Sequence, residues 1–310
     1  MRRFAKLVLV LVALVLMAEG ALRLIGLGDP VLLQPDGRCG YVLRPNQAHF
    51  RFLAHTRINA ESMRSEPIAA QKPPGSYRLM FVGDSIAYGT TMVDQDAIFV
   101  EVLHRELPAI LHCRVEVLNA SASAWAIDNE LAYIESRGIF QSDRVILVLN
   151  DGDLDQRVST VNDVGSALYF EKPACAFCEL VHHYASRARA DKGSVVESDA
   201  GQREKNLKSL TVFRDYVYAH NSGMILLFVP FRRDVKSPSS RVIQTELASW
   251  ARQNEVPVID ATPLLAQLSV KEASVDGGTH LSVKGNQAVA KSFEQSLANP
   301  ALLQTRAGSL

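Results

Sequence analysis

The sequence predicts an α/β domain built on a parallel sheet with helices on both faces. From residue 77 onward, short apolar runs alternate with longer amphipathic stretches. This alternation is typical of a chain that crosses over through a helix between parallel strands. The composition agrees with an ordinary folded protein, since 47% of the residues are apolar and 21% are charged.

Five short apolar runs bounded by turn residues are expected to form the strands. They span residues 77–82, 114–118, 144–149, 224–229 and 256–259. Five helices are expected from the helical spacing of apolar residues, at 97–107, 127–137, 202–220, 239–254 and 282–297. The third run, Arg-Val-Ile-Leu-Val-Leu, is apolar enough for a central strand.

The chain begins with basic residues followed by an uninterrupted apolar run at residues 7–18. As a helix this run would span about 18 Å, whereas continuation to Ile25 gives about 28 Å, near the ~30 Å of a bilayer core. We therefore expect residues 1–26 to be a signal anchor that crosses a membrane once and leaves the body exported. Ala18-Glu19-Gly20 is also a passable cleavage site, so a removed signal peptide is the alternative.

The rest of the chain divides by its pattern. Residues 27–76 carry turn residues and little periodicity, so we expect a juxtamembrane stalk along the domain, with one or two short strands near residues 48–58. Residues 77–300 are expected to form the main domain, and 301–310 a tail. Residues 154–200 are too long for a plain crossover and predict a partly helical insertion near the site.

Four cysteines accompany the predicted export. Cys175 and Cys178 form a C-x-x-C pair, with His182 and His183 close behind. Export favours disulfides over free thiols, but their pairing cannot be read from the sequence, and a local disulfide is one interpretation of this pair. Two unpaired cysteines or a zinc site are the alternatives, although structural zinc sites usually separate two ligand pairs.

Charge and motifs exclude several classes of function. Lys+Arg and Asp+Glu each number 33, so the net charge is zero and binding to nucleic acid by bulk charge is not expected. There is no dinucleotide or phosphate-loop motif, and we predict no cofactor and no metal. Asp153-Leu154-Asp155 is expected to be the solvated end of a strand in preference to a cation site.

Candidate chemistry lies at the carboxyl ends of the strands. Gly83-Asp84-Ser85 follows the first strand, and His280 lies just before the last helix with Asp276 on the same loop. A serine needs a base to become a nucleophile, and the base needs an orienting group. Ser85 as nucleophile, His280 as base and Asp276 as its partner is therefore one interpretation. A helix-capping serine and an ordinary loop histidine are the other.

Four short segments, in this order along the chain, resemble the conserved blocks of the SGNH (GDSL-type) hydrolase family. Gly83-Asp84-Ser85 is similar to block I and residues 118–125 to block II. Residues 148–151, Val-Leu-Asn-Asp, are similar to block III, and residues 276–280 to block V. The likeness covers roughly residues 77–298 and extends more softly to membrane-anchored bacterial members. It implies a flavodoxin-like three-layer sandwich with a periplasmic body held at the inner membrane.

The resemblance also implies residue roles and an activity. Ser85 would attack an ester, His280 would carry the proton, and Asp276 would hold the ring. The oxyanion would meet the amides of Ser85 and Ser121 and the side chain of Asn150. The expected function is a serine esterase that removes acyl groups, acetyl among them, from envelope carbohydrate or lipid.

Three positions depart from the family pattern. Ser121 and Val148 occupy positions that are glycine in blocks II and III, and the acid of block V stands one residue early. Two alternatives therefore remain open: an O-acyltransferase that modifies an exopolysaccharide, and a catalytically weakened binding protein of an envelope complex.

Overall fold

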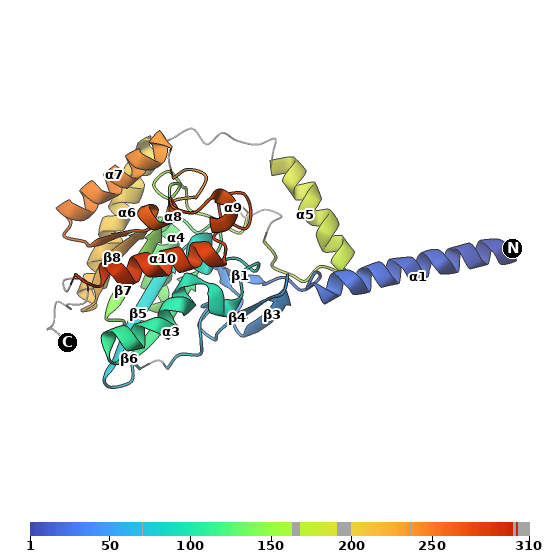
Figure 1. Cartoon of the computed structure of the whole chain (residues 1–310), viewed down its shortest axis with the longest axis horizontal. Coiled ribbons are helices and arrows are strands. Elements are labelled where there is room, and N and C mark those ends of the chain that lie inside the picture. Colours follow the sequence, from blue (N-terminus) through green and yellow to red (C-terminus); the bar gives the residue numbers. More distant parts are fainter. Residues whose placement is uncertain (70, 163–167, 191–199, 236, 300–301, 303–310) are drawn as a thin grey trace.

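A central sheet of five strands organises the body (Figure 1). In this computed structural model the strands are β5 (Ser76–Gly83), β6 (Arg114–Ser121), β7 (Arg144–Leu149), β8 (Gly223–Phe228) and β9 (Val258–Asp260). All neighbouring pairs are parallel, which confirms the predicted α/β class. The order is β6-β5-β7-β8-β9, so the chain reverses its direction of winding beside β5. In open α/β sheets ligands bind at such a reversal, outside the carboxyl ends of the strands.

The structure describes most of the chain. The described residues are 1–69, 71–162, 168–190, 200–235, 237–299 and 302. The expected tail at 301–310 therefore lies outside them apart from Leu302. Residues 163–167 and 191–199 of the expected insertion also lie outside them.

Two helices cover one face of the sheet, and three cover the other. Leu79 and Phe81 of β5 point to the face covered by α3 (Phe99–Leu111) and α10 (Val283–Ser296). The Phe81 ring lies 5.7 Å from that of Phe99 and 5.6 Å from that of Phe293, measured between centroids.

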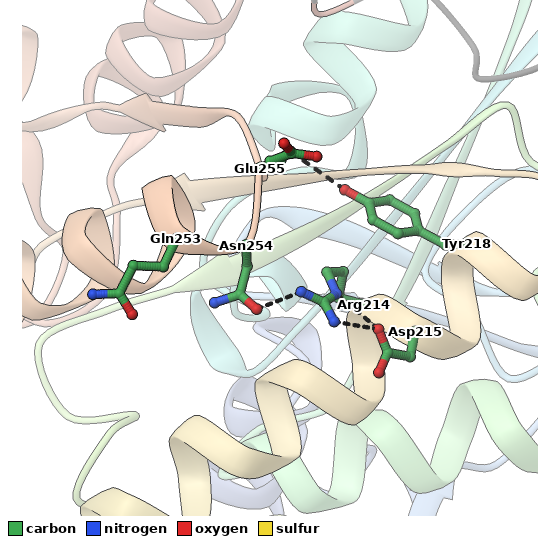
Figure 2. Close-up of a pocket in the computed structure, with 6 residues that line it drawn as sticks. All are labelled: Arg214, Asp215, Tyr218, Gln253, Asn254 and Glu255. Atoms are coloured by element: carbon green, nitrogen blue, oxygen red, sulfur yellow. Dashed lines mark hydrogen bonds and ion pairs between the residues drawn. The ribbon is translucent and has the colours of Figure 1, made fainter.

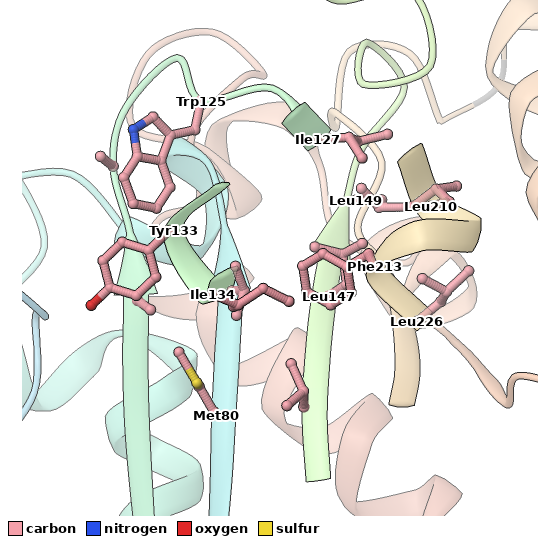
Figure 3. Close-up of a cluster of buried hydrophobic side chains, with 14 of the residues drawn as sticks. Met80, Trp125, Ile127, Tyr133, Ile134, Leu147, Leu149, Leu210, Phe213 and Leu226 are labelled. Atoms are coloured by element: carbon pink, nitrogen blue, oxygen red, sulfur yellow. The ribbon is translucent and has the colours of Figure 1, made fainter. Parts of the chain in front are cut away.

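The second face is covered by α4 (Ile127–Arg137), α6 (Ala200–Ala219) and α7 (Pro238–Gln253). Figure 3 shows Met80 and Leu147 from the strands packed among Ile134 of α4 and Phe213 of α6. Successive strand residues point to opposite faces, so each strand contributes to both cores. Both faces are covered by helices and buried, which explains why the strands read as continuous apolar runs.

The long elements lie within a few residues of their predicted bounds. The largest difference is α3, which continues past Pro108 to Leu111 instead of ending at residue 107. A proline lacks the amide that would bond the carbonyl four residues back, but near a helix end this removes a single bond. The short elements are α2 (Ser85–Tyr88), η1 (Gln95–Ala97), α8 (Thr262–Leu265) and α9 (Val270–Ala273).

The N-terminal helix stands clear of the body. Helix α1 (Arg2–Leu24) has no buried residue and projects away from the sheet (Figure 1). Within the described part of the chain it is the one helix long and apolar enough to cross a membrane, and a signal sequence has the same properties. Helix α5 (Ala176–Ala190), within the predicted insertion, lies beside the end of α1.

Residues 27–76 pack more deeply than a stalk would. They form two antiparallel hairpins, β1 (Leu33–Asp36) with β2 (Gly40–Leu43) and β3 (Gln47–Arg51) with β4 (Ala54–Ile58). The first hairpin was not expected from the sequence. Tyr41 of β2 is buried in the core of the second sheet face, and its backbone carbonyl accepts a hydrogen bond from the Trp125 indole at 3.0 Å. The segment is therefore part of the body.

Candidate active site

The turn after β5 presents Ser85 at the carboxyl edge of the sheet. A Cβ at Gly83 would lie 2.9 Å from the Cβ of Ala87 and 3.1 Å from that of Val148, so the close approach of β5, α2 and β7 requires glycine. Asp84 caps α2, because its carboxylate accepts from the Ile86 amide at 2.8 Å. Ser85 is the first residue of that short helix.

His280 and Asp276 meet Ser85 from the loop before α10. The Nε2 atom of His280 lies 3.0 Å from the Oγ of Ser85. The Nδ1 atom of the same ring contacts the Asp276 carboxylate. The structure thus brings together the three residues singled out as nucleophile, base and orienting acid, in hydrogen-bonding order.

The loop that carries this pair absorbs the early position of the acid. Gly277 and Gly278 adopt positive φ values of +88° and +123°, which other residues rarely adopt. The Ser274 hydroxyl accepts from the Gly278 amide at 2.7 Å and donates to Asp276 Oδ1 at 3.0 Å. With this compact turn, an acid four residues before the histidine reaches the same ring nitrogen.

The Asp276 carboxylate is held in its ionised form. Burial acts to raise its pKa, but the hydrogen bonds and charge of His280, together with Ser274, outweigh burial. The pKa of Asp276 therefore lies below its ordinary value. An ionised partner on Nδ1 leaves Nε2 free to accept the proton of the Ser85 hydroxyl.

Of the predicted oxyanion donors the Asn150 side chain is already engaged, whereas at Ser121 the bond described is made by the hydroxyl and not by the predicted backbone amide. Ser121 ends β6 directly opposite Gly83, and its hydroxyl donates to Asn119 Oδ1 at 2.6 Å. The Asn150 side-chain amide donates to Asp84 Oδ2 at 3.0 Å and to Asp153 Oδ1 at 3.1 Å. The side-chain amide of Asn150 thus donates to two carboxyl groups. One of these two hydrogen bonds must break before Asn150 can donate to a substrate oxygen.

Sequence reasoning missed two residues that position this site. Asp153 binds both the backbone amide and the side chain of Asn150, with the amide at 2.6 Å. Asn119 donates from Nδ2 to the Ala87 carbonyl of α2 at 2.8 Å. Asp153 is 1% exposed, so its interpretation as part of a solvated strand end was wrong. The sequence carries a local signal for Asp153, because this acid stands three residues after the asparagine that follows a predicted strand.

The environment behind Ser85 is rich in buried acids. Burial raises the pKa of Asp84, of Asp153 and of Glu130 on α4. For Asp153 and Glu130 the nearby acidic side chains raise it further. Among the described residues no group of three histidine, cysteine or acidic side chains is arranged to hold a metal ion. Cys175 and Cys178 form a disulfide.

A second, polar depression lies away from these residues. It has a volume of about 400 Å³ and is lined by residues of the C-terminal half of α6 and the loop after α7 (Figure 2). On α6 Arg214 forms an ion pair with its neighbour Asp215, and it also donates to the Asn254 side chain on the other side. These segments precede β8 and β9, so the depression lies at the amino edge of the sheet, opposite Ser85.

Comparison with known proteins gives a fold likeness. No model of a known family matches the sequence, and no curated protein matches it. The chain is similar in structure to a member of the lipolytic protein G-D-S-L family from Veillonella parvula, with 14% identity, a TM-score of 0.46, and coverage of 72% of this chain and 99% of that one. It is also similar to the acetylxylan esterase Axe2 from Geobacillus stearothermophilus, with 17% identity, a TM-score of 0.48, and coverage of 72% and 95%.

Proposed function

We propose that this chain is a membrane-anchored, extracytoplasmic serine esterase of the SGNH type. It removes acyl groups, acetyl among them, from envelope carbohydrate or lipid. One observation carries the proposal: Ser85 Oγ lies 3.0 Å from His280 Nε2, whose other nitrogen contacts Asp276. A hydroxyl, an imidazole and a carboxylate in that order are the elements of nucleophilic acyl transfer.

The proposed reaction has two halves. Ser85 Oγ attacks the ester carbonyl while its proton passes to His280 Nε2, and the intermediate collapses as His280 returns that proton to the departing alcohol. Water then attacks the acyl-serine with His280 as base, and the acid leaves. The proposed donors to the oxyanion are the backbone amides of Ser85 and Ser121 and the side-chain amide of Asn150, once one of its hydrogen bonds has broken. Each such donor is worth about 100- to 1000-fold in rate.

The direct test is covalent labelling of the full-length protein in detergent micelles with a fluorophosphonate. We expect a single adduct on the peptide that contains Ser85. Ser85→Ala should abolish both labelling and turnover of 4-nitrophenyl acetate, and His280→Ala should slow both by about 1000-fold or more. The matched control is Ser123→Ala, a hydroxyl on the loop after β6 that plays no part in the proposal.

The outcomes separate the proposal from its rivals. Folding is checked by Tm, which should stay within about 2 °C for all three variants. Undiminished labelling of Ser85→Ala would refute the serine mechanism, and an unlabelled wild-type chain would support a binding role. Acyl groups recovered on a polysaccharide acceptor, with no free acid, would favour the transferase.

A further inference from the structure

Exposed apolar side chains gather around the body end of α1. They belong to the end of α1, to the tip of the β3–β4 hairpin and to one side of α5, and they range from 40% exposed at Phe52 to 78% at Leu53. We call this set the apolar collar: Ile25, Phe52, Leu53, Phe177, Val181 and Tyr184. The α5 members are spaced at i, i+4 and i+7, so they share one face of the helix.

The hairpin tip is fixed to the end of α1. The Phe52 amide donates to the Ile25 carbonyl at 2.8 Å, and Arg51 donates to the Gly26 carbonyl at 2.7 Å. The tip is therefore placed where α1 enters the body.

The sequence of this tip is unusual for its backbone. Arg51 pairs with Ala54, so the turn has two residues, Phe52 and Leu53, with φ values of +50° and +65°. Such turns strongly prefer Asn-Gly, because other residues are strained at positive φ. Two large apolar residues stand here instead, both exposed to solvent. Their presence at a position that disfavours them points to a contact outside the chain.

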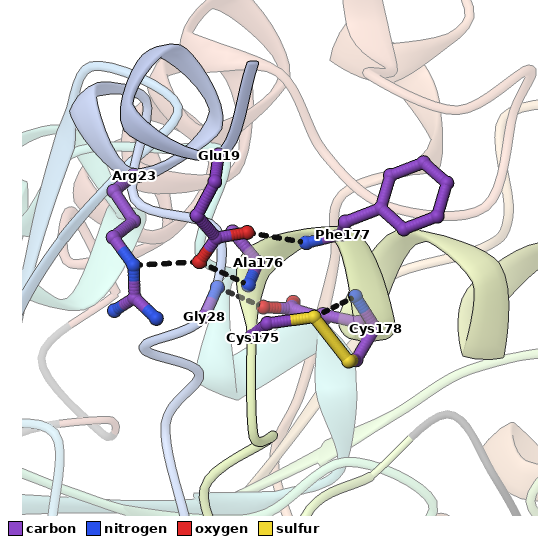
Figure 4. The surroundings of a disulfide bond; sticks show 8 residues. Glu19, Arg23, Gly28, Cys175, Ala176, Phe177 and Cys178 are labelled. Atoms are coloured by element: carbon purple, nitrogen blue, oxygen red, sulfur yellow. Dashed lines mark hydrogen bonds and ion pairs between the residues drawn. A yellow bond between two sulfur atoms is a disulfide. The ribbon is translucent and has the colours of Figure 1, made fainter. Parts of the chain in front are cut away.

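Helix α5 is fixed to α1 at a definite height. The Glu19 carboxylate on α1 accepts from the amides of Ala176 and Phe177 at 2.9 and 3.1 Å and pairs with Arg23 (Figure 4). From the body side, Glu179 forms a buried ion pair with Arg51. The first turn of α5 is thus clamped between α1 and the hairpin, and the Cys175–Cys178 disulfide closes it.

The length of α1 sets the depth of the collar. Its 23 residues span about 35 Å, slightly more than the ~30 Å hydrocarbon core. Residues 7–25 account for about 28 Å of that core, so Glu19 and Arg23 lie in the last turns of the span, near its far interface. Phe177, which donates to Glu19, shares that depth, and Figure 1 shows α5 running across the direction of α1. Aromatic residues are enriched at this level of a bilayer.

We propose that the apolar collar rests in the lipid interface of the bilayer that holds α1. The occupant of this surface is the lipid itself, because both parts of the collar are bonded to the last turns of α1. The body is then held at three places, α1, the hairpin tip and α5, and cannot swing freely on its anchor. This inference rests on retention of α1 and not on catalysis by Ser85.

The test uses the full-length chain in phosphatidylethanolamine–phosphatidylglycerol liposomes with brominated acyl chains, which quench nearby tryptophan. The native Trp125 and Trp250 are buried and give a constant background. Leu53→Trp and Tyr184→Trp should each add tryptophan emission. This added emission should be at least twofold weaker in brominated than in unbrominated lipid. The matched control is Val242→Trp on α7, where the valine is 56% exposed. Intact mass confirms that α1 is retained.

The outcomes are decisive in either direction. Quenching of the two collar tryptophans no greater than that of Val242→Trp would overturn the proposal. The proposal would also be overturned if the two tryptophans were shielded from water only at high protein-to-lipid ratios. That result would indicate that a second copy of the chain, and not lipid, covers the collar. A second variant guards against misfolding: Phe52→Asn with Leu53→Gly suits the turn, should raise Tm, and should reduce quenching at Tyr184→Trp by removing one contact.

Discussion

Glu130 is the residue whose environment conflicts most with its chemistry. Its side chain is 1% exposed, and one carboxyl oxygen has no hydrogen-bond partner among the residues that the structure describes. Burial, and then the charges of Asp153 and Asp84, raise its pKa well above the ordinary value of 4.5. Between the ordinary and the raised value, the folded chain holds a proton that the unfolded chain releases. Stability therefore falls as pH rises across that range.

Replacing this carboxyl with an uncharged amide should remove that pH dependence. We expect Glu130→Gln to raise Tm relative to wild type more at pH 8 than at pH 5, by about 2 °C or more, because each pKa unit corresponds to about 1.4 kcal/mol. Thermal unfolding followed by circular dichroism at the two pH values measures the difference. Glu135→Gln on the same helix is the control. Equal Tm differences at both pH values would contradict the assignment.

At this scale the sequence predicted which three side chains meet, those of Ser85, Asp276 and His280, but not their surroundings. Ser85, Asp276 and His280 lie beside glycine-rich turns at strand ends, and such positions are visible in a local pattern. Glu130 lies in an ordinary helix with nothing local to mark it, and the block II resemblance includes Asn119 without indicating its contact with α2. Their roles depend on which segment packs opposite, and that is a property of the fold.

Among the elements, α2 depends on a residue from a distant segment. Arg64 is fully buried, and its guanidinium donates to the carbonyls of Tyr88, Thr90 and Val93 and to the Gln95 side chain. These acceptors form the end of α2 and the loop after it. A planar fork with five donors can satisfy four acceptors at once, whereas an ammonium has three donors.

Arg64→Lys should therefore leave buried acceptors unpaired, although the positive charge is kept. An unpaired buried acceptor costs about 1–3 kcal/mol, which corresponds to a decrease in Tm of about 2 °C or more. The labelling rate at Ser85 should fall as well, because α2 begins at that residue. The control is Arg57→Lys, whose ion pair with Glu66 is half exposed and worth about 1 kcal/mol or less. An unchanged Tm for Arg64→Lys would refute this role.

The long elements were predictable because their signals are local. Helix α4 and strand β7 have the predicted bounds, since each combines strong periodicity or an apolar run with clear stop residues. The hairpin β1–β2 was not predicted, because its turn-rich sequence shows no alternation of apolar and polar residues. Its burial comes from Tyr41 and Val42 packing on the sheet. Tertiary contact, not propensity, makes these strands.

For the whole molecule, the hairpin segment and the sheet share one hydrophobic core. Residues 27–76 contribute Tyr41, Ile58 and Met63 to the core as well as the buried Arg64. A boundary at residue 77 would separate Tyr41, Ile58 and Met63 from the core residues that they cover. Those core residues would then be exposed to solvent. A domain that begins at β5 has an uncovered apolar surface over α4 and the β6 end.

We therefore expect a chain of residues 27–310 to fold and a chain of residues 77–310 to fail. The longer chain should be soluble and unfold in one cooperative transition, and the shorter one should aggregate or bind a hydrophobic dye without a transition. Soluble yield, far-ultraviolet circular dichroism and thermal melts compare the two. A cooperative melt from residues 77–310 would restore the stalk interpretation of the first segment.

The separation of Ser85 and His280 by 195 positions has a consequence for biosynthesis. A ribosome delivers the hydroxyl long before the imidazole, and until then the nascent polypeptide holds a serine with no base beside it. The pair forms only when the last helix closes onto the finished sheet. A truncated product that ends before residue 280 lacks the imidazole, so the order of translation leaves Ser85 without a partner until the chain is nearly complete.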